Sequence, residues 1–345
     1  MDVFANERYE EMLMSLTTAF GGRARSLALI LLGLTAAAAP ASAQTYPSRP
    51  ITIVVPFQAG SGTDTVARVL AEHMGKEIGQ PMVVENKAGA NGSIAATYVA
   101  RAAPDGYTIF LSTNTPHASA PTLMKSVSYD PIKDFAPITR VGNYTFVLAV
   151  HAGVPVNSVK ELITLAKAEP GKHSFASGNS TGIVSGERFK TLTKTDIFHV
   201  PYKSSPGALN DLLGGRVTMM FIDLAPSLSH FEAKSLKALA TSRGDRSPLM
   251  PQVPTFKEAG VDDMVIESWA ALYAPANTPP EVVARLNAEA RKVLSRADVK
   301  EVLAKGGFDT LTSTPAELAE YTKAQLTVWS QMIKDAGIAR SEGTQ

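Results

Sequence analysis

The chain has 345 residues, enough for about two domains that each bury a hydrophobic core. Hydrophobic residues make up 45% of it and charged residues 19%, which excludes a disordered chain and a chain embedded mostly in a membrane. The net charge of +1, without basic runs, argues against nucleic acid as a partner, and the absence of cysteine excludes disulfides, thiolate catalysis and cysteine-ligated zinc.

The N-terminus has the three parts of a secretory signal peptide. Arg23 and Arg25 precede an apolar run over 27–39, and Ala41-Ser-Ala43 supplies a small-residue cleavage site. The apolar run is too short to span a membrane comfortably. We therefore expect residues 1–43 to be removed after Ala43, which leaves a soluble periplasmic protein.

The first elements after this segment are a strand, a glycine loop and a helix. The β-branched run Ile51–Val55 predicts a buried strand, and the loop Ala59-Gly-Ser-Gly62 follows it. We expect Thr63 or Asp64 to be the N-cap of the next helix. A helix that begins at a glycine loop presents free N–H groups and a positive dipole end to an anion. We therefore expect main-chain groups to bind a carboxylate here, without a basic side chain.

Strands and helices continue to alternate along the first half of the chain. The pattern predicts a strand over 82–85, a helix over 93–103, a strand over 107–111 and a polar loop over 112–117. This order is typical of a parallel, doubly wound sheet, in which the loops after the strands meet at one edge. The loops of this half should therefore line one crevice.

A second α/β series follows. Its first helix is opened by a capping box at Ser158. A strand over 174–177, a loop over 178–182 and a helix to 194 come next, followed by a strand over 197–200 and a helix over 205–213. The last two strands cover 217–222, which leads into Asp223, and 236–240. The loop over 178–182 repeats the small-residue chemistry of the first glycine loop. Two such loops facing each other across a cleft would suit a ligand with an acid group at each end.

The C-terminal part predicts a return strand and two helices. The strand covers 268–274, and the helices start at Thr278 and Thr314, each with a capping box. One stripe of the last helix is apolar, which predicts packing against a core; its residues are Leu318, Tyr321, Val328, Trp329, Met332 and Ile333.

Two other functions have partial motifs. Gly60-Ser-Gly62, with Glu85 at the end of the next strand, is similar to a dinucleotide-binding fingerprint, but Thr65 stands where the third glycine belongs. Gly178-Asn-Ser180-Thr-Gly182 fits the nucleophile motif of serine hydrolases, so an exported hydrolase using Ser180 is an alternative function. Against it, Asp223 lies closer to His230 than hydrolase scaffolds usually place acid and base. The scattered histidines predict no metal site.

Short motifs along the whole mature chain resemble those of one family of bacterial extracytoplasmic receptors. They include Tyr46-Pro-Ser-Arg-Pro-Ile51, Gly62-Thr-Asp64, Gly79-Gln-Pro81, Ala103-Pro-Asp-Gly-Tyr107, Lys133-Asp-Phe-Ala-Pro137, His199-Val-Pro-Tyr-Lys203, Asp211-Leu-Leu-Gly-Gly215 and Val253-Pro-Thr255. The order and completeness of these motifs match the Bug receptors, which are the substrate-binding proteins of tripartite tricarboxylate transporters.

The resemblance implies an α/β protein of the type II periplasmic-binding-protein fold, with two doubly wound lobes joined by two crossing strands around a ligand cleft. The signal peptide would be followed by one lobe over 44–146 with 273–345 and a second lobe over 147–272. It also implies a receptor and not an enzyme, with no cofactor and no metal. The implied partners are the membrane permease subunits of such a transporter, or a membrane sensor.

In this family, main-chain N–H groups, hydroxyls and ordered waters hold a ligand carboxylate. Carried over to this chain, the expected ligand contacts are Phe57, Gln58, Gly60, Ser61, Gly62, Thr63, Asp64, Asn114, His117, Asn179, Ser180, Thr181 and Asp223. The chain departs from the family where an Asp-Asn pair is usual, because it has Ile222-Asp223 instead. An anionic Asp223 would repel a second ligand carboxylate, which leaves room for an amino, hydroxyl or aromatic acid.

Overall fold

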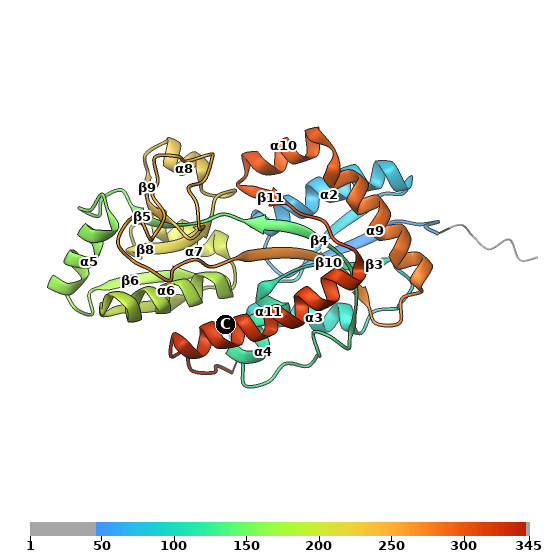
Figure 1. Cartoon of the computed structure of the whole chain (residues 1–345), viewed down its shortest axis with the longest axis horizontal. Coiled ribbons are helices and arrows are strands. Elements are labelled where there is room, and N and C mark those ends of the chain that lie inside the picture. The colour runs from blue at the N-terminus through green and yellow to red at the C-terminus, as the bar shows by residue number, and fades with distance from the viewer. Residues whose placement is uncertain (1–45, 343–345) are drawn as a thin grey trace, which may run out of the picture. The chain divides into compact units, whose positions relative to one another are not determined.

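The structure, a computed structural model, describes residues 46–342 of the chain (Figure 1). The predicted signal peptide and its cleavage site at Ala43 lie outside these residues. Two β-sheets, one of six strands and one of five, organise the described part. We call each sheet with its helices a lobe, lobe 1 for the six-stranded sheet and lobe 2 for the five-stranded one. Between residues 46 and 342, no helix combines the length and the apolar character that a membrane crossing needs.

The sheet of lobe 1 has the strand order β11-β4-β10-β3-β1-β2. Its strands are β1 (Ile51–Val55), β2 (Met82–Asn86), β3 (Thr108–Thr113), β4 (Phe135–Tyr144), β10 (Ser268–Pro275) and β11 (Phe308–Thr310). β1 pairs in parallel with both β2 and β3, as predicted, whereas β10 is antiparallel to β3 and β4. The sheet is therefore mixed and not parallel throughout, because the chain returns from lobe 2 along β10.

Helices cover both faces of this sheet (Figure 1). One face carries α2 (Gly62–Ile78), α9 (Pro280–Ser295) and α10 (Ala297–Lys305), and the other carries α3 (Ser93–Ala100), α4 (Ala120–Leu123) and α11 (Pro315–Asp335). The predicted apolar stripe of α11 is core for the most part, with Leu318, Trp329 and Ile333 buried, but Val328 is 46% exposed and was wrongly included.

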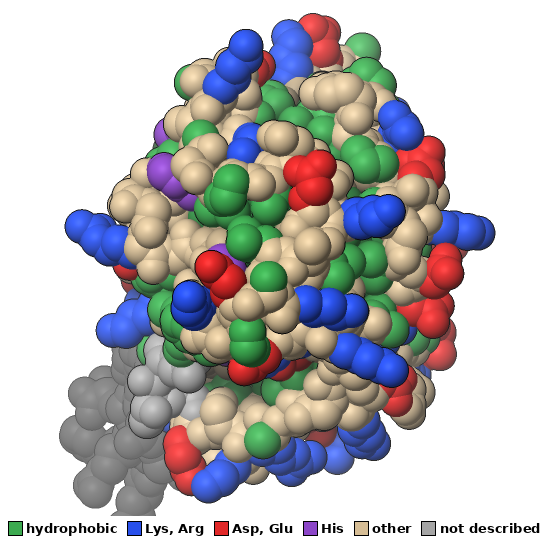
Figure 2. Space-filling view, turned by 90° about the vertical axis from the view of Figure 1, so that its left-hand side faces the viewer, with side chains coloured by type: hydrophobic (Ala, Val, Ile, Leu, Met, Phe, Trp, Pro, Cys, Tyr) green, Lys and Arg blue, Asp and Glu red, His purple; other side chains and the backbone are tan. Residues whose placement is uncertain are grey.

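The sheet of lobe 2 has the order β7-β6-β8-β5-β9, with β6 parallel to β7 and β8, and β5 antiparallel to β8 and β9. Its strands are β5 (Phe146–His151), β6 (His173–Ser177), β7 (Ile197–Pro201), β8 (Met219–Asp223) and β9 (Leu236–Thr241). Its helices are α5 (Val159–Ala168), α6 (Ser180–Thr193), α7 (Ser205–Leu213) and α8 (Leu228–Glu232). Figure 2 shows the end of this lobe, where basic, acidic and hydrophobic side chains are interspersed.

The predicted helix starts have different outcomes. The box of Thr314 and Glu317 opens α11 with both of its hydrogen bonds. Ser158 caps α5 as predicted, since its hydroxyl accepts from Glu161 N–H. At the third predicted box, Thr278 does not cap α9; its hydroxyl donates to the carbonyl of Pro275 instead. The N-cap of α2 is Ser61, whose hydroxyl accepts from Asp64 N–H, and neither Thr63 nor Asp64 has this role.

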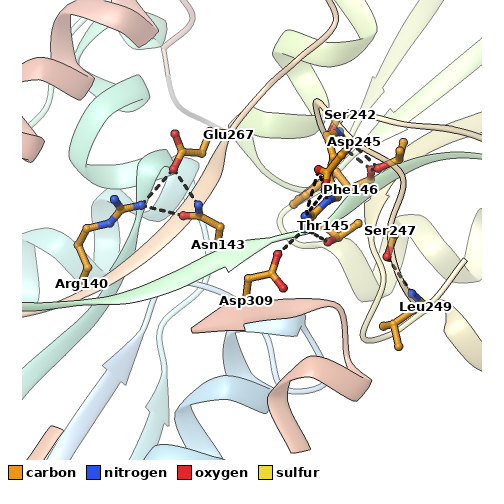
Figure 3. A network of polar contacts seen from close by, with 12 residues as sticks. Arg140, Asn143, Thr145, Phe146, Ser242, Asp245, Ser247, Leu249, Glu267 and Asp309 are labelled. Atoms are coloured by element: carbon orange, nitrogen blue, oxygen red, sulfur yellow. Dashed lines mark hydrogen bonds and ion pairs between the residues drawn. The ribbon is translucent and has the colours of Figure 1, made fainter. Parts of the chain in front are cut away.

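The chain crosses between the lobes at two places, after Tyr144 and before Ser268. Thr145 is bound by both lobes, since its N–H donates to the Gly307 carbonyl of lobe 1 and its own carbonyl accepts from Leu224 N–H of lobe 2. Figure 3 shows the polar contacts around this crossing. Because β10 pairs with lobe 1 strands from Ser268 onward, the return to lobe 1 precedes the expected boundary at 272/273.

Candidate functional site: a pocket between the lobes

A small pocket lies where the two lobes meet. Lobe 1 and the crossing strands contribute Phe57, Ser61, Gly62, Thr63, Thr113, Asn114, Thr115, Tyr144, Phe146 and Ser268, and lobe 2 contributes Asn179, Thr181, Ser205 and Asp223. The lining contains hydroxyls, amides, three aromatic rings and a single acidic side chain. The predicted site is thus largely assembled, from loops that are far apart in the sequence.

The N-terminus of α2 forms the lobe 1 side of the pocket. β1 ends at Val55, and the loop after it turns at Gly60, whose φ of +82° lies in the left-handed region that glycine adopts most easily. Ser61 then caps the helix, and Gly62 and Thr63 form its first turn at the pocket wall. Within the described chain, Thr63 N–H has no hydrogen-bond partner, so it is available as a donor.

The N-terminus of α6 forms the facing wall from lobe 2. Asn179 caps this helix, since its side-chain oxygen accepts from Gly182 N–H at 2.9 Å. Thr181 lines the pocket, and its N–H also lacks a partner among residues 46–342. Two helix N-termini from different lobes therefore aim at one space, and both attract negative charge.

The lobes are in direct contact around the pocket. Ser180 of lobe 2 is fully buried, and its hydroxyl lies 2.9 Å from that of Thr115 and 2.8 Å from that of Ser119, both in lobe 1. At the mouth, Gln58 N–H donates to the hydroxyl of Ser204 at 3.2 Å. These contacts describe a closed arrangement of the lobes.

Asp223 is the one acidic side chain in the lining. It ends β8, is 5% exposed, and its Oδ2 atom has no hydrogen-bond partner. A Cβ added to Gly62 would lie 2.0 Å from this oxygen, so the carboxyl group sits against the first turn of α2. Burial raises the pKa of Asp223 to about 6, although the backbone N–H groups of Asp223 and Gly62 oppose the shift.

Asp64 has a structural role that the sequence did not indicate. Its carboxylate accepts from Gly60 N–H, from Asn86 and from both the Nε and Nη2 atoms of Arg68. Burial alone would raise the pKa of Asp64, but these hydrogen bonds together lower it. The group fixes the glycine loop against α2 and lies outside the pocket lining, so its expected ligand contact is not seen in this closed arrangement.

His117 lies away from the pocket, contrary to expectation. It belongs to the π-helix η2 (Thr115–Ser119), which turns its fully buried ring onto Tyr273 at 3.9 Å between centroids. Its Nδ1 atom is 2.6 Å from the hydroxyl of Ser112, and burial lowers its pKa to about 3. A neutral, packed imidazole of this kind serves the core of lobe 1.

Three other expected contacts also lie outside the lining, namely Gln58, Gly60 and Ser180.

The surroundings of Ser180 bear on the hydrolase alternative. Its hydroxyl is bonded to Asn114, Thr115 and Ser119, and no histidine is among its partners in the described chain. A serine nucleophile needs a base within hydrogen-bond reach, so this arrangement lacks the required geometry.

Six lining residues were missed by the sequence analysis: Thr113, Thr115, Tyr144, Phe146, Ser205 and Ser268. Ser205 had a local signal, because it begins a helix directly after a parallel strand. Tyr144, Phe146 and Ser268 flank the two crossings, and their position depends on pairings between strands distant in the sequence.

A larger groove lies on the outside of lobe 2, beside α8 and β9. Every residue that lines it belongs to lobe 2, so closure of the lobes cannot enclose a ligand there.

Across residues 46–342, no group of three or more histidine and acidic side chains is arranged to hold a metal ion.

Comparisons with known proteins agree with this geometry. The family model described as "Tripartite tricarboxylate transporter family receptor" matches residues 66–338. The protein BugT of Bordetella pertussis is 36% identical over 311 residues, which cover 89% of this chain and 95% of BugT.

Two solved structures from Rhodopseudomonas palustris are also similar. One, a protein with adipate, is 34% identical with a TM-score of 0.84, and the match covers 86% of this chain and all of that one. The other, MatC with bound malate, is 31% identical with a TM-score of 0.79, over 84% of this chain and all of MatC. The family match and these similarities, together with the two-lobed type II periplasmic-binding-protein fold, show that the chain belongs to the tripartite tricarboxylate transporter receptor family.

Proposed function

We propose that this protein is a periplasmic solute receptor that binds a small organic carboxylate between its lobes. It then delivers the ligand to the permease subunits of a tripartite tricarboxylate-type transporter, or presents its closed form to a membrane sensor. The observation that carries the proposal is the convergence of the N-termini of α2 and α6 on one pocket. The adipate and malate bound by similar receptors support the same ligand class.

The binding chemistry follows from the donors at the two walls. Thr63 N–H and Thr181 N–H are available, one on each lobe, and the Ser205 hydroxyl in the lining only accepts a bond, from Asn179, so its proton is available as well. Each N–H that meets a carboxylate oxygen forms a charge-assisted hydrogen bond, which is stronger than a neutral one. A ligand that contacts both walls binds the closed form better than the open form and so shifts the protein toward closure.

A thermal-shift screen of the mature protein against organic acids and their amides tests this function. A ligand at 100 times its dissociation constant should stabilise the protein by about 2.7 kcal/mol, whereas its amide should not. Gly62→Ala should abolish the shift, because the added methyl group would collide with Asp223 at the pocket wall.

Gly207→Ala is the matched control, since it lies in the first turn of α7 and its Cβ would make an ordinary 3.6 Å contact with Tyr202. It should keep the shift. Equal loss of the shift in both variants, or no acid that stabilises the wild type, would contradict the proposal. Esterase activity that Ser180→Ala abolishes would favour the hydrolase instead.

A further inference from the structure

We propose that Asp223 selects a ligand that carries a positively charged nitrogen as well as a carboxylate, so that the ligand is an aminocarboxylate. The inference rests on the proposed function and specifies the ligand class of the same site. It goes beyond carboxylate capture, because helix N-termini alone do not distinguish an amino acid from a simple diacid.

The first argument is the unpaired oxygen of Asp223. The side chain is buried and lines the pocket, yet Oδ2 accepts no hydrogen bond of regular geometry from the described chain. Gly62 N–H lies near enough to oppose the rise in the pKa of Asp223, but it does not satisfy this oxygen. Buried carboxylate oxygens are usually paired, and one without a partner is costly. Because this oxygen belongs to a side chain of the pocket wall, a ligand group that donates to it supplies what the protein lacks.

The second argument is the absence of a compensating basic side chain. No lysine, arginine or histidine is among the residues that line the pocket. Arg68, on α2, is held by Asp64, and Arg243, after β9, pairs with Asp245 and Asp309. Both of these guanidinium groups are therefore already engaged.

The third argument concerns the rest of this wall. Tyr144 and Phe146 line the pocket beside Asp223, and Phe146 is its direct partner in the β5–β8 pairing. The Tyr144 hydroxyl donates to Thr63 Oγ1 at 3.1 Å, so it is not free to donate to a ligand anion. Aromatic rings attract cations, including methylated ammonium groups, and offer little to a second carboxylate.

These features give the pocket two unlike ends. The α6 N-terminus with Thr181 N–H and the hydroxyl of Ser205 offers donors to a carboxylate, and Asp223 with its aromatic neighbours offers an acceptor to a cation. A diacid would bring a second negative charge to Asp223, and one of the two groups would have to be protonated. An aminocarboxylate satisfies both ends without a proton.

Isothermal titration of the wild type and Asp223→Asn with matched ligand pairs tests this inference. Each pair is an amino acid and its deaminated analogue, such as aspartate with succinate or glutamate with glutarate; trimethylglycine with acetate tests a methylated nitrogen. In at least one pair the wild type should bind the amine by about 10- to 100-fold more tightly, as expected for a charged hydrogen bond. Asp223→Asn keeps the shape of the side chain and should remove or reverse this preference.

The pH dependence provides a second measurement. Binding of the amine should tighten between pH 5 and pH 7.5 in the wild type, as Asp223 becomes ionised, and should change less in Asp223→Asn. Tighter binding of diacids, weakening as pH rises, would overturn the inference and indicate a shared proton at Asp223. Binding of carboxylates with no preference in either variant would overturn it as well. If neither variant binds any carboxylate, the proposed function itself fails.

Discussion

Asn114 of lobe 1 donates a hydrogen bond to Thr181 of lobe 2, with 3.0 Å between Nδ2 and Oγ1. The same side chain accepts from Ser268 Oγ at 3.1 Å and from Trp269 N–H at 3.3 Å, at the start of the return strand. One buried amide thus joins the loop after β3, the N-terminus of α6 and the second crossing. Because it has partners in both lobes, it couples the stability of lobe 1 to closure.

Asn114→Ala should lower both stability and ligand affinity. The change leaves the buried N–H of Trp269 and the hydroxyl of Ser268 without their acceptor, which should cost about 1–3 kcal/mol of unfolding free energy. Urea unfolding measures this loss. The exposed Asn210 of α7 provides the control, since Asn210→Ala should change stability little. Equal effects of the two substitutions would show that Asn114 has no special role.

An ion pair at the crossing should favour the closed form. Arg243 of lobe 2 pairs with Asp309 of lobe 1 and also donates to Thr145, next to the first crossing (Figure 3). Asp309 is 52% exposed, so we expect Asp309→Asn to weaken ligand binding by no more than about 5-fold, or roughly 1 kcal/mol. The effect should shrink in high salt.

The control for this pair lies within a single lobe. Arg246 and Glu258 form an ion pair inside lobe 2, at 2.9 Å, and Glu258 is about as exposed as Asp309. Glu258→Gln should leave ligand affinity unchanged, because opening and closing do not alter that pair. If Asp309→Asn and Glu258→Gln have the same effect on affinity, the Arg243–Asp309 pair does not act on closure.

The predictable parts of the site are those with local causes. The loop before α2 and the loop before α6 have small residues and capping side chains directly after a strand, and these signals are contained in a few residues. The cap itself was misplaced by two or three residues, because Ser61, Thr63 and Asp64 are all good N-caps and only the backbone path distinguishes them.

The unpredicted parts depend on contacts between distant segments. Tyr144 and Phe146 reach the pocket because Tyr144 pairs with Ser268 of β10 and Phe146 pairs with Asp223 of β8. His117 lies away from it because η2 is a π-helix, and a polar loop sequence does not specify that turn. The position of a loop after a strand predicts that its residues lie near the cleft, but the fold decides which way their side chains face.

His117 should make the protein less stable in acid. Its folded pKa is about 3, below the usual value near 6.5, so the unfolded chain takes up a proton that the folded protein excludes. The stability present above pH 6.5 is therefore lost progressively as the pH falls toward 3, by up to about 1.4 kcal/mol per pH unit. Unfolding free energies measured between pH 7 and pH 4.5 should decline accordingly.

His117→Gln should flatten this decline, because its amide can still bond to Ser112 but does not titrate in this range. His151→Gln, which changes a half-buried side chain at the end of β5, should leave the decline in place. An equally steep acid limb in His117→Gln would assign the loss of stability to other groups, for example His199, whose pKa burial lowers to about 4.

Asp223 should have the opposite pH dependence in the ligand-free protein. Its folded pKa of about 6 exceeds the value of 3.8 for a free aspartate, so the folded state binds the proton more tightly. Its contribution to stability is present below pH 3.8 and is lost as the pH rises through 6. Asp223→Asn removes this loss, and it should be more stable than the wild type by about 1–3 kcal/mol at pH 8, with a much smaller difference at pH 4.

Urea unfolding of the two proteins at both pH values measures this difference in unfolding free energy. A difference that is the same at pH 4 and pH 8 would show that folding does not raise the pKa of Asp223. A residue that weakens the empty receptor at neutral pH is useful only if a ligand compensates for it. Because an ammonium group would do so and a second carboxylate would not, adding the preferred amino acid should reverse the order of stability and make the wild type more stable than Asp223→Asn at pH 8.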